Sequence, residues 1–348
     1  MSLSLIHLAE KEPHPALWTD TFRTALAPLG ALALVPNAGA LTPAARAALV
    51  REHDVVISGW GGAQLPEELA ANSGRVRYIC HLTGGMRTHI PLALVESHLP
   101  VTNWGDAPAF EVAEGTLTLL LACLKNLRAH IDEKRDGRWS TNFTLTGPAG
   151  RGGTLRNLRV GLYGVGMIGR RFATMLLALG AKVHAFDPFA PELPEGVRRV
   201  ATLEELFSQS DAVSLHAGVN PSTIGSVNAA LLRLLPDGGI VINTARGQIV
   251  DQEALFAELA SGRLRAGLDV LDHPETGDAL PADHPARQWP NLILTAHAIA
   301  TNHWPYRMSD PACPLQAFHE VALDNLGRFA RGEPLRFRIT PEQYQRMT

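Results

Sequence analysis

The stretch RVGLYGVGMIGRRFATMLLALGAKVHAFD, residues 159–187, decides which fold the sequence predicts. An apolar run at 159–163 predicts a buried strand, and the turn Gly164-Val165-Gly166-Met167-Ile168-Gly169 follows it at once. Apolar residues then recur at helical spacing, and 182–186 predicts a second strand. A strand, a glycine turn, a helix and a second strand form the unit that binds dinucleotides.

The three glycines of this turn have separate physical roles. Gly164 permits the tight bend, Gly166 lets the backbone approach a pyrophosphate, and Gly169 lets the helix lie close to the sheet. The phosphates then bind unpaired amides at the helix start, among them those of Met167 and Ile168. We therefore expect a dinucleotide cofactor at this turn.

The end of the second strand indicates which dinucleotide. Asp187 stands there, and a carboxylate in this place accepts hydrogen bonds from the ribose hydroxyls. It would repel a 2′-phosphate, and no arginine follows it directly. The sequence therefore favours NAD over NADP.

Strands and helices alternate along the rest of the chain. The other predicted strands are 3–8, 31–35, 54–58, 76–80, 212–215, 240–243, 267–270 and 292–295. The other predicted helices are 44–51, 91–97, a long one over about 110–135, and a last one over about 315–331 that Gly332 ends. This alternation is typical of parallel sheets covered by helices on both faces.

These elements predict two α/β domains. Residues 105–298 would form a Rossmann dinucleotide-binding domain. Residues 1–104 and 299–348 would form a flavodoxin-like substrate domain that is discontinuous, because the last helix packs back on the N-terminal part.

Composition argues against several other classes of protein. A net charge of -3 is unsuited to binding nucleic acid by phosphate neutralisation. The three cysteines are too scattered for a disulfide framework or a CxxC metal site. No apolar run approaches the roughly 18 residues of a membrane span, and the N-terminal apolar patch is too short for a signal peptide. We expect a cytoplasmic protein without a metal or a membrane partner.

Three further segments carry a resemblance: INTARG at 242–247, LDV at 268–270 and PNLILTAH at 290–297. With the glycine turn, they resemble the D-isomer-specific 2-hydroxyacid dehydrogenases. That family includes glyoxylate/hydroxypyruvate reductases, D-lactate dehydrogenase and phosphoglycerate dehydrogenase. The resemblance covers most of residues 75–335, whereas the first 70 residues match only in general architecture.

The resemblance implies that Arg246, Glu275 and His297 carry the chemistry. A hydride would move between the nicotinamide and C2 of a 2-keto or 2-hydroxy acid. His297 would exchange the proton on the C2 oxygen, and Glu275 would pair with the other ring nitrogen and fix its tautomer. Arg246 would bind the substrate carboxylate. Glu275 keeps the family spacing from Arg246 but lacks the usual following proline, so Asp272 is a rival carboxylate.

The resemblance also implies residues that line the cofactor. Asp269 would hold the nicotinamide carboxamide. The others are Thr244 and Ala245 through their backbone, His216 and Ala217 along the adenosine, and Thr116 near the phosphates. For Asp269 and Thr116 a purely structural role, as a buried strand-end residue and a helix residue, is an equally fair interpretation.

The substrate loop departs from the family pattern. The family has a Gly-x-Gly-x-Asp turn whose amides hold the substrate carboxylate. Here Thr83 replaces the first glycine, Gly84 and Gly85 keep the backbone permissive, and Arg87 replaces the Asp. Either Arg87 or Arg307 reads a second anionic group on the substrate, or both are ordinary surface arginines.

Two functions fit this sequence. One is an NAD-dependent dehydrogenase acting on a small 2-hydroxy or 2-keto acid. The other is an NADH-binding regulatory protein of the same fold with little turnover. The resemblance further implies a homodimer formed through the cofactor domain, and the short stretch after the last helix argues against a C-terminal regulatory domain.

Overall fold

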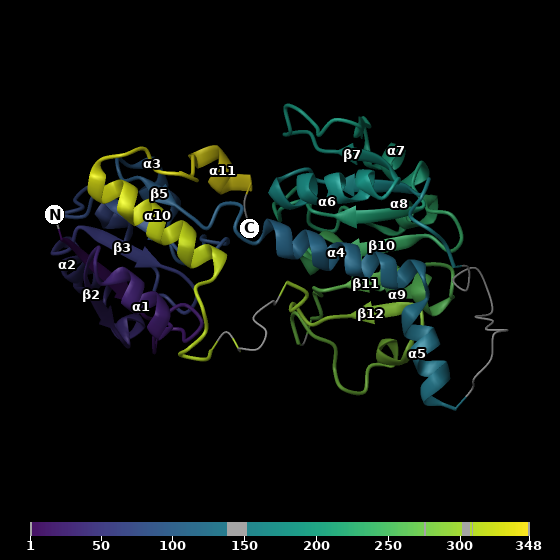
Figure 1. Cartoon of the computed structure of the whole chain (residues 1–348), viewed down its shortest axis with the longest axis horizontal. Helices are drawn as coiled ribbons and strands as arrows, with labels where there is room; N and C mark the ends of the chain where they lie inside the picture. Colours follow the sequence, from purple (N-terminus) through teal and green to yellow (C-terminus); the bar gives the residue numbers. More distant parts are fainter. Residues whose placement is uncertain (1, 138–151, 275, 301–306, 308, 347–348) are drawn as a thin grey trace. The chain divides into compact units, whose positions relative to one another are not determined.

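The computed structural model of the chain describes residues 2–137, 152–274, 276–300, 307 and 309–346 (Figure 1). It divides into two compact units. The first unit comprises Met1–Pro108 with Asn302–Thr348, and the second comprises Ala109–Thr301.

The first unit is built on a five-stranded parallel sheet. Its strands are β1 (Leu3–Leu8), β2 (Gly30–Val35), β3 (Val55–Ser58), β4 (Tyr78–His81) and β5 (Val101–Thr102). They lie in the order β2-β1-β3-β4-β5. This is the strand order of flavodoxin-like folds, as the sequence predicts.

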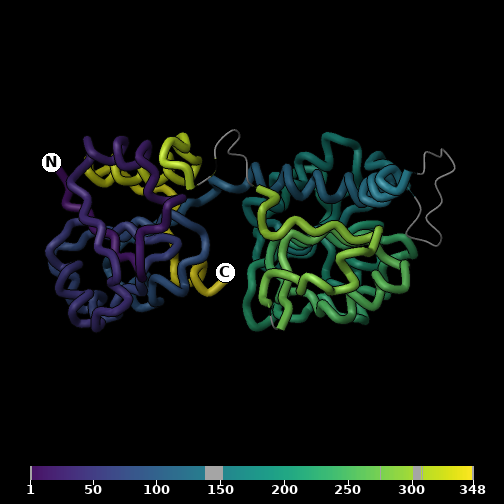
Figure 2. Tube along the Cα trace, turned by 90° about the horizontal axis from the view of Figure 1, so that it is seen from below, coloured from purple at the N-terminus to yellow at the C-terminus, as the bar shows by residue number. Residues whose placement is uncertain are grey.

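Helices cover both faces of this sheet. They are α1 (Asp20–Leu26), α2 (Pro43–Arg51), α3 (Leu92–Glu96), α10 (Ala317–Arg331) and α11 (Pro341–Arg346), with short 3-10 turns η1 (Ala38–Ala40) and η2 (Glu67–Ala70). Both views show α10, in yellow, lying among the purple N-terminal elements (Figures 1 and 2). Phe318 and Leu326 of α10 join Leu5 and Ile57 of the sheet in one buried cluster. The end of the chain thus completes the core formed by its beginning.

The second unit is built on a seven-stranded parallel sheet. Its strands are β6 (Arg159–Tyr163), β7 (Lys182–Phe186), β8 (Arg198–Arg199), β9 (Ala212–Leu215), β10 (Ile240–Asn243), β11 (Arg265–Leu268) and β12 (Leu292–Leu294). Their order is β12-β11-β10-β9-β6-β7-β8. The chain direction across the sheet reverses between β6 and β9, and open α/β sheets bind ligands beyond the carboxyl ends of the strands at such a point.

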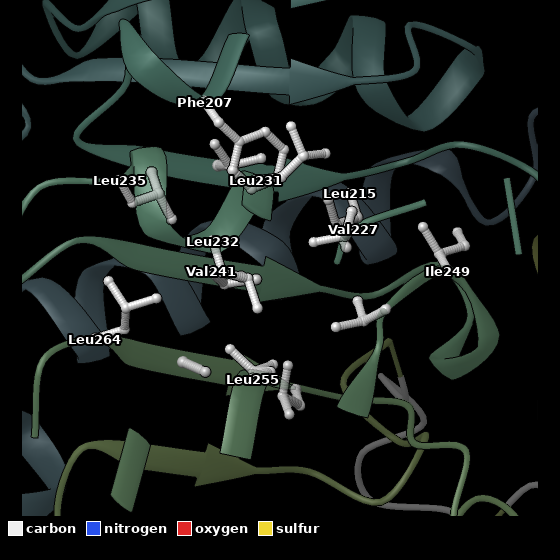
Figure 3. Close-up of a cluster of buried hydrophobic side chains, with 14 of the residues drawn as sticks. Phe207, Leu215, Val227, Leu231, Leu232, Leu235, Val241, Ile249, Leu255 and Leu264 are labelled. Atoms are coloured by element: carbon white, nitrogen blue, oxygen red, sulfur yellow. The ribbon is translucent and has the colours of Figure 1, made fainter. Parts of the chain in front are cut away.

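The helices of the second unit are α4 (Ala109–Leu124), α5 (Leu127–Arg135), α6 (Met167–Ala178), α7 (Leu203–Ser208), α8 (Ala229–Leu234) and α9 (Gln252–Ala260), with 3-10 turns η4 (Gly247–Ile249) and η5 (Pro285–Gln288). One face of the sheet packs on α7, α8 and α9. Figure 3 shows the resulting core, in which Leu232, Val241 and Leu255 meet. The Rossmann-type unit predicted from the glycine turn is confirmed.

The predicted single helix over 110–135 is wrong, because the chain breaks between α4 and α5. Asn126 adopts a left-handed conformation with φ of 51°. The Arg265 guanidinium takes the Cys123 carbonyl at 3.0 Å, which a continuous helix would have used for the amide of Leu127. Arg265 is itself buried in β11, which begins two residues earlier than predicted. A buried arginine in a strand thus accounts for both errors.

Candidate active site

The glycine turn lies between β6 and α6 at the carboxyl end of the sheet. Gly164 has φ of 93°, and a Cβ there would lie 2.7 Å from the Ala217 nitrogen. A Cβ on Gly169 would lie 2.6 Å from the Gly164 carbonyl oxygen. Both positions therefore need glycine for the fold itself.

Gly166 is different, since a Cβ there would meet nothing within 4 Å. Gly166 is the N-cap of α6, and no side chain caps that helix end. The first amides of α6 therefore face open space at the positive end of the helix dipole, which fits a pyrophosphate. The fold itself thus has room for a Cβ at Gly166, unlike at Gly164 and Gly169.

Asp187 ties the end of β7 to this turn. Its Oδ2 accepts from the Val165 amide at 2.7 Å, and its Oδ1 accepts from the amides of Phe189 and Ala190 at 2.8 and 3.0 Å. Arg199 donates to the Asp187 carbonyl oxygen at 2.8 Å. The carboxylate therefore lies beside the glycine turn, where the sequence predicts it.

His216 and Ala217 follow β9 and lie against the turn. The Gly164 backbone closely approaches Ala217, and the His216 ring lies 5.3 Å from the Phe172 ring of α6, measured between centroids. Burial lowers the pKa of His216 to about 4, so this ring is neutral near pH 7. Its Nε2 lies 2.9 Å from the Ser214 hydroxyl.

Thr116 and Thr244 also meet in the second unit. The Thr116 hydroxyl donates to the Val112 carbonyl at 2.7 Å, so the Thr244 hydroxyl at 2.8 Å is the donor between the two threonines. Thr116 of α4 is fully buried. The structure thus brings it to the end of β10, beside another residue predicted to line the cofactor.

Arg246 stands just beyond β10. The Asn243 side chain fixes its backbone by accepting from the Ala245 amide at 3.0 Å and donating to the Arg246 carbonyl at 2.9 Å. Burial lowers the pKa of the Arg246 guanidinium, and the nearby Asp278 carboxylate opposes this effect. A half-buried cation held in this way is suited to binding a carboxylate.

His297 has a carboxylate partner that the sequence analysis missed. Its Nδ1 donates to Asp278 Oδ2 at 2.6 Å, and Asp278 Oδ1 accepts from the Leu271 amide at 2.6 Å. Because Nδ1 carries the donated proton, Nε2 is the ring nitrogen left for chemistry. Arg246 interacts electrostatically with the same Asp278.

Of the two carboxylates weighed from the sequence, the structure describes only Asp272. Glu275 lies outside the described residues, so its pairing with His297 stays a prediction. Asp272 is exposed, and its amide donates to the Gln252 side chain at 2.9 Å. His273 and Gly277 form two backbone bonds of 2.8 Å, and this tight loop carries the chain on to Asp278.

Asp269 supports the turn that carries His297. Its Oδ1 accepts from the Thr295 hydroxyl at 2.6 Å and from the amides of Ala298 and Ile299 at 2.9 and 3.1 Å. Its carbonyl accepts from the His297 amide at 2.6 Å. Ala296 and His297 both have positive φ, at 50° and 55°, which costs free energy for residues with a Cβ. Asp269 therefore stabilises a strained turn.

The predicted substrate loop lies in the first unit, after β4. The His81 Nε2–H is shared by the Gly85 carbonyl at 3.0 Å and the Thr83 hydroxyl at 2.8 Å. Burial lowers the pKa of His81 to about 3, so the ring is neutral. Within the described part of the chain, the amides of Thr83, Gly84 and Gly85 donate to no acceptor. Amides without an acceptor are suited to binding an anionic ligand.

The two arginines that were suggested to bind a second anionic group of the substrate make other contacts in the structure. The Arg87 guanidinium donates to the carbonyls of Tyr344 and Gln345 in α11. Arg307 is exposed, and its carbonyl accepts from the Asp310 amide at 2.9 Å. Neither contact supports the hypothesis of a doubly charged substrate.

The described residues offer no metal site and no membrane helix. None of their His, Cys, Asp and Glu side chains gather in groups of three or more that could hold a metal ion. No helix in the same part of the chain is long and apolar enough to cross a membrane.

The second unit has a parallel sheet with a glycine turn at its switch point. An Arg, an Asp and a His follow the carboxyl ends of its other strands. Together these features define a dinucleotide-binding oxidoreductase fold. Residues 117–298, more than half of the chain, match the family described as "D-isomer specific 2-hydroxyacid dehydrogenase, NAD binding domain". The chain therefore belongs to the D-isomer-specific 2-hydroxyacid dehydrogenases, and its second unit is a nicotinamide-cofactor domain.

Individual relatives agree with this assignment. Over 209 residues the chain is 37% identical to a hydroxypyruvate reductase of Thermotoga maritima, covering 60% of this chain and 63% of that protein. It is 28% identical to a hydroxypyruvate reductase of Blautia hydrogenotrophica, over 78% of this chain and 81% of that protein. The solved TT0316 protein from Thermus thermophilus is 29% identical, with a TM-score of 0.68 over 97% of this chain and 99% of that one.

Proposed function

We propose that the protein is an NAD-dependent dehydrogenase that interconverts a D-2-hydroxy acid and its 2-keto acid. The observation that carries the proposal is the His297–Asp278 pair at 2.6 Å with Arg246 beside it, in the unit that holds the glycine turn. The hydroxypyruvate reductases among its relatives act on substrates of this class.

The residues have distinct roles in this proposal. The bound nicotinamide supplies or accepts the hydride at C2 of the substrate. His297 Nε2 gives a proton to the C2 oxygen in reduction and takes it back in oxidation. Asp278 holds the ring in the tautomer and orientation that this transfer needs. Arg246 binds the substrate carboxylate.

We assign the carboxylate partner of His297 to Asp278. The contact of 2.6 Å between His297 Nδ1 and Asp278 Oδ2 supports this assignment, as does the second bond that orients Asp278 on the Leu271 amide. In the first unit, the amides of Thr83, Gly84 and Gly85 are proposed to bind the substrate carboxylate, because they have no acceptor among the residues that the structure describes. Asp269 Oδ1 accepts the hydrogen bonds that stabilise the strained turn. The other oxygen, Oδ2, is proposed to hold the nicotinamide carboxamide.

NAD is the proposed cofactor because the Asp187 carboxylate lies beside the glycine turn, where it would repel a 2′-phosphate. We also propose a homodimer formed through the second unit, in the cytoplasm. Leu127 and Ile131 on α5 are 49% and 47% exposed and give that unit an apolar surface to bury.

The test is NADH and NADPH oxidation with glyoxylate, hydroxypyruvate, pyruvate, phenylpyruvate and 2-oxoglutarate. We expect turnover with at least one of them, and a lower KM for NADH than for NADPH. Arg246→Ala should abolish turnover and leave the Kd of NADH nearly unchanged. NADH binding with no turnover of any of these acids would refute the enzyme and favour the regulatory function.

A further inference from the structure

The predicted substrate loop is fastened to the last helix of the chain. Arg87 Nη2 donates to the Gln345 carbonyl at 2.7 Å and to the Tyr344 carbonyl at 3.2 Å, and Arg87 Nε reaches the Tyr344 carbonyl at 3.3 Å. In the opposite direction, the Tyr344 hydroxyl donates to the Ile90 carbonyl at 2.7 Å. Both ends of the segment 87–90 are thus bonded to α11.

The positive charge of Arg87 suits the carboxyl end of α11. Thr340 and Gln343 start the helix, since each side chain accepts from the other residue's amide at 3.2 and 3.0 Å. The last carbonyls of a helix have no partner within it, and a cation is favourable at this negative end. The Asp that the family has in place of Arg87 would repel these carbonyls. The departure from the family pattern is therefore what α11 requires.

The same contacts bear on the two glycines of the loop. Upstream, the Gly85 carbonyl accepts from buried His81, and the Met86 side chain is fully buried. Downstream, Arg87 is the first residue bonded to α11. Gly84 and Gly85 thus lie between two hydrogen-bonded positions, and their own amides have no acceptor among the described residues.

We propose that Arg87 is a positioning residue: by binding α11 it holds the Gly84 and Gly85 amides in the orientation that receives the substrate carboxylate. This inference rests on the proposed function, because it presumes that those amides bind a 2-keto acid. It gives α11 a part in substrate binding, although α11 supplies no group that touches the substrate.

The first test compares Arg87→Ala with Arg46→Ala in the full-length chain. Arg46 is a matched control, because its Nη1 also donates to backbone carbonyls of the first unit, at 2.9 Å to Leu41 and 3.4 Å to Ala38. Loss of charge-assisted bonds should raise the KM of the 2-keto acid about tenfold in Arg87→Ala. The kcat and the Kd of NADH should stay within about twofold of the unmodified protein, and Arg46→Ala should not change the KM.

Arg87→Lys serves as the conservative variant, since lysine keeps the charge without the planar fork, and its KM should fall between the two. The second test is hydrogen exchange of residues 82–90, which needs no turnover. Exchange there should be faster in Arg87→Ala than in Arg46→Ala. An unchanged KM in Arg87→Ala, an equal rise in Arg46→Ala, or unchanged exchange would overturn the inference. If the unmodified protein reduces no 2-keto acid, the proposed function fails, and exchange alone still decides whether Arg87 holds the loop.

Discussion

Asp269→Ala is the change that most directly tests how His297 is held. Three hydrogen bonds converge on Asp269 Oδ1, and Ala296 and His297 lie in the left-handed region, at φ of 50° and 55°. Left-handed backbone costs about 1–2 kcal/mol for each residue with a Cβ, so the turn stores about 3 kcal/mol. Hydrogen bonds to a charged acceptor contribute about 1.5–3 kcal/mol each, so the three bonds offset this strain.

Without the carboxylate, the strained turn loses all three bonds and keeps only those that His297 itself makes, from its amide to the residue 269 carbonyl and from Nδ1 to Asp278. A shift of about 3 kcal/mol lowers the population of the turn geometry about 100-fold, and kcat should fall by about that factor. Steady-state oxidation of NADH with a 2-keto acid measures kcat, and thermal unfolding checks that the variant is folded.

The matched variant is Ala296→Gly, because glycine adopts positive φ at little cost. In the Asp269→Ala background it should recover about fivefold of kcat, equal to about 1 kcal/mol of relieved strain. Alone, Ala296→Gly should leave kcat near that of the unmodified protein. Glycine at 296 cannot replace a lost contact to the carboxamide, so a double variant no better than Asp269→Ala refutes the positioning argument. A kcat within threefold in Asp269→Ala refutes it as well.

The other predictions concern the glycine turn, Asp278 and a buried histidine. Gly166→Ala should keep the unfolding temperature but weaken NADH binding at least tenfold in titration, whereas Gly164→Ala should lower the unfolding temperature because its Cβ would lie 2.7 Å from the Ala217 nitrogen. Asp278→Asn keeps the shape but loses the acceptor charge on His297, so kcat should fall at least tenfold with the Kd of NADH unchanged, and full activity would refute the assignment. Burial lowers the pKa of His7 to about 4, so the unfolded chain binds the proton more readily and stability falls as pH drops below about 6.5. His7→Asn keeps a donor to the Ile57 carbonyl. Between pH 7.5 and 5, the free energy of unfolding of this variant, measured with urea, should fall by about 2 kcal/mol less than that of the unmodified protein. An equal fall in both proteins would contradict this.

Sequence patterns predict this fold well because its main signals are local. The strand and glycine turn at 159–169 and the apolar runs at 3–8 and 240–243 depend on neighbouring residues only, and the structure confirms them. The start of α7 is likewise fixed locally, because the Thr202 hydroxyl accepts from the Glu205 amide at 3.1 Å and the Glu205 carboxylate accepts from the Ala201 amide at 2.8 Å. Each of these features specifies its conformation without help from distant parts of the chain.

Features that depend on distant contacts were beyond the sequence pattern. The helix break at Asn126 exists because Arg265, far along the chain, takes a carbonyl of α4. Helices α1 and α11 were not predicted for a different reason: with seven and six residues they are too short to show a helical period. Asp278 was missed for a reason related to that of the helix break: its contact with His297 joins residues 19 positions apart, which no local pattern specifies. The available sequence signal was Pro281, which follows Asp278 after two residues, since the family's carboxylate usually precedes a proline.

The departures of the substrate loop from the family pattern fit a rebuilt site better than a lost one. Thr83 replaces a glycine, but its φ is not positive, and its hydroxyl accepts from His81 at 2.8 Å. Gly85 is retained, Gly84 stands at the variable position where a Cβ would lie 2.6 Å from the Trp104 ring, and Arg87 gains α11 as a partner. These contacts use the Gly85 carbonyl and the Thr83 and Arg87 side chains, and among the described residues the amides of Thr83, Gly84 and Gly85 have no acceptor. An anion can therefore still bind at the backbone, and in our proposal the altered side chains act on the orientation of that backbone.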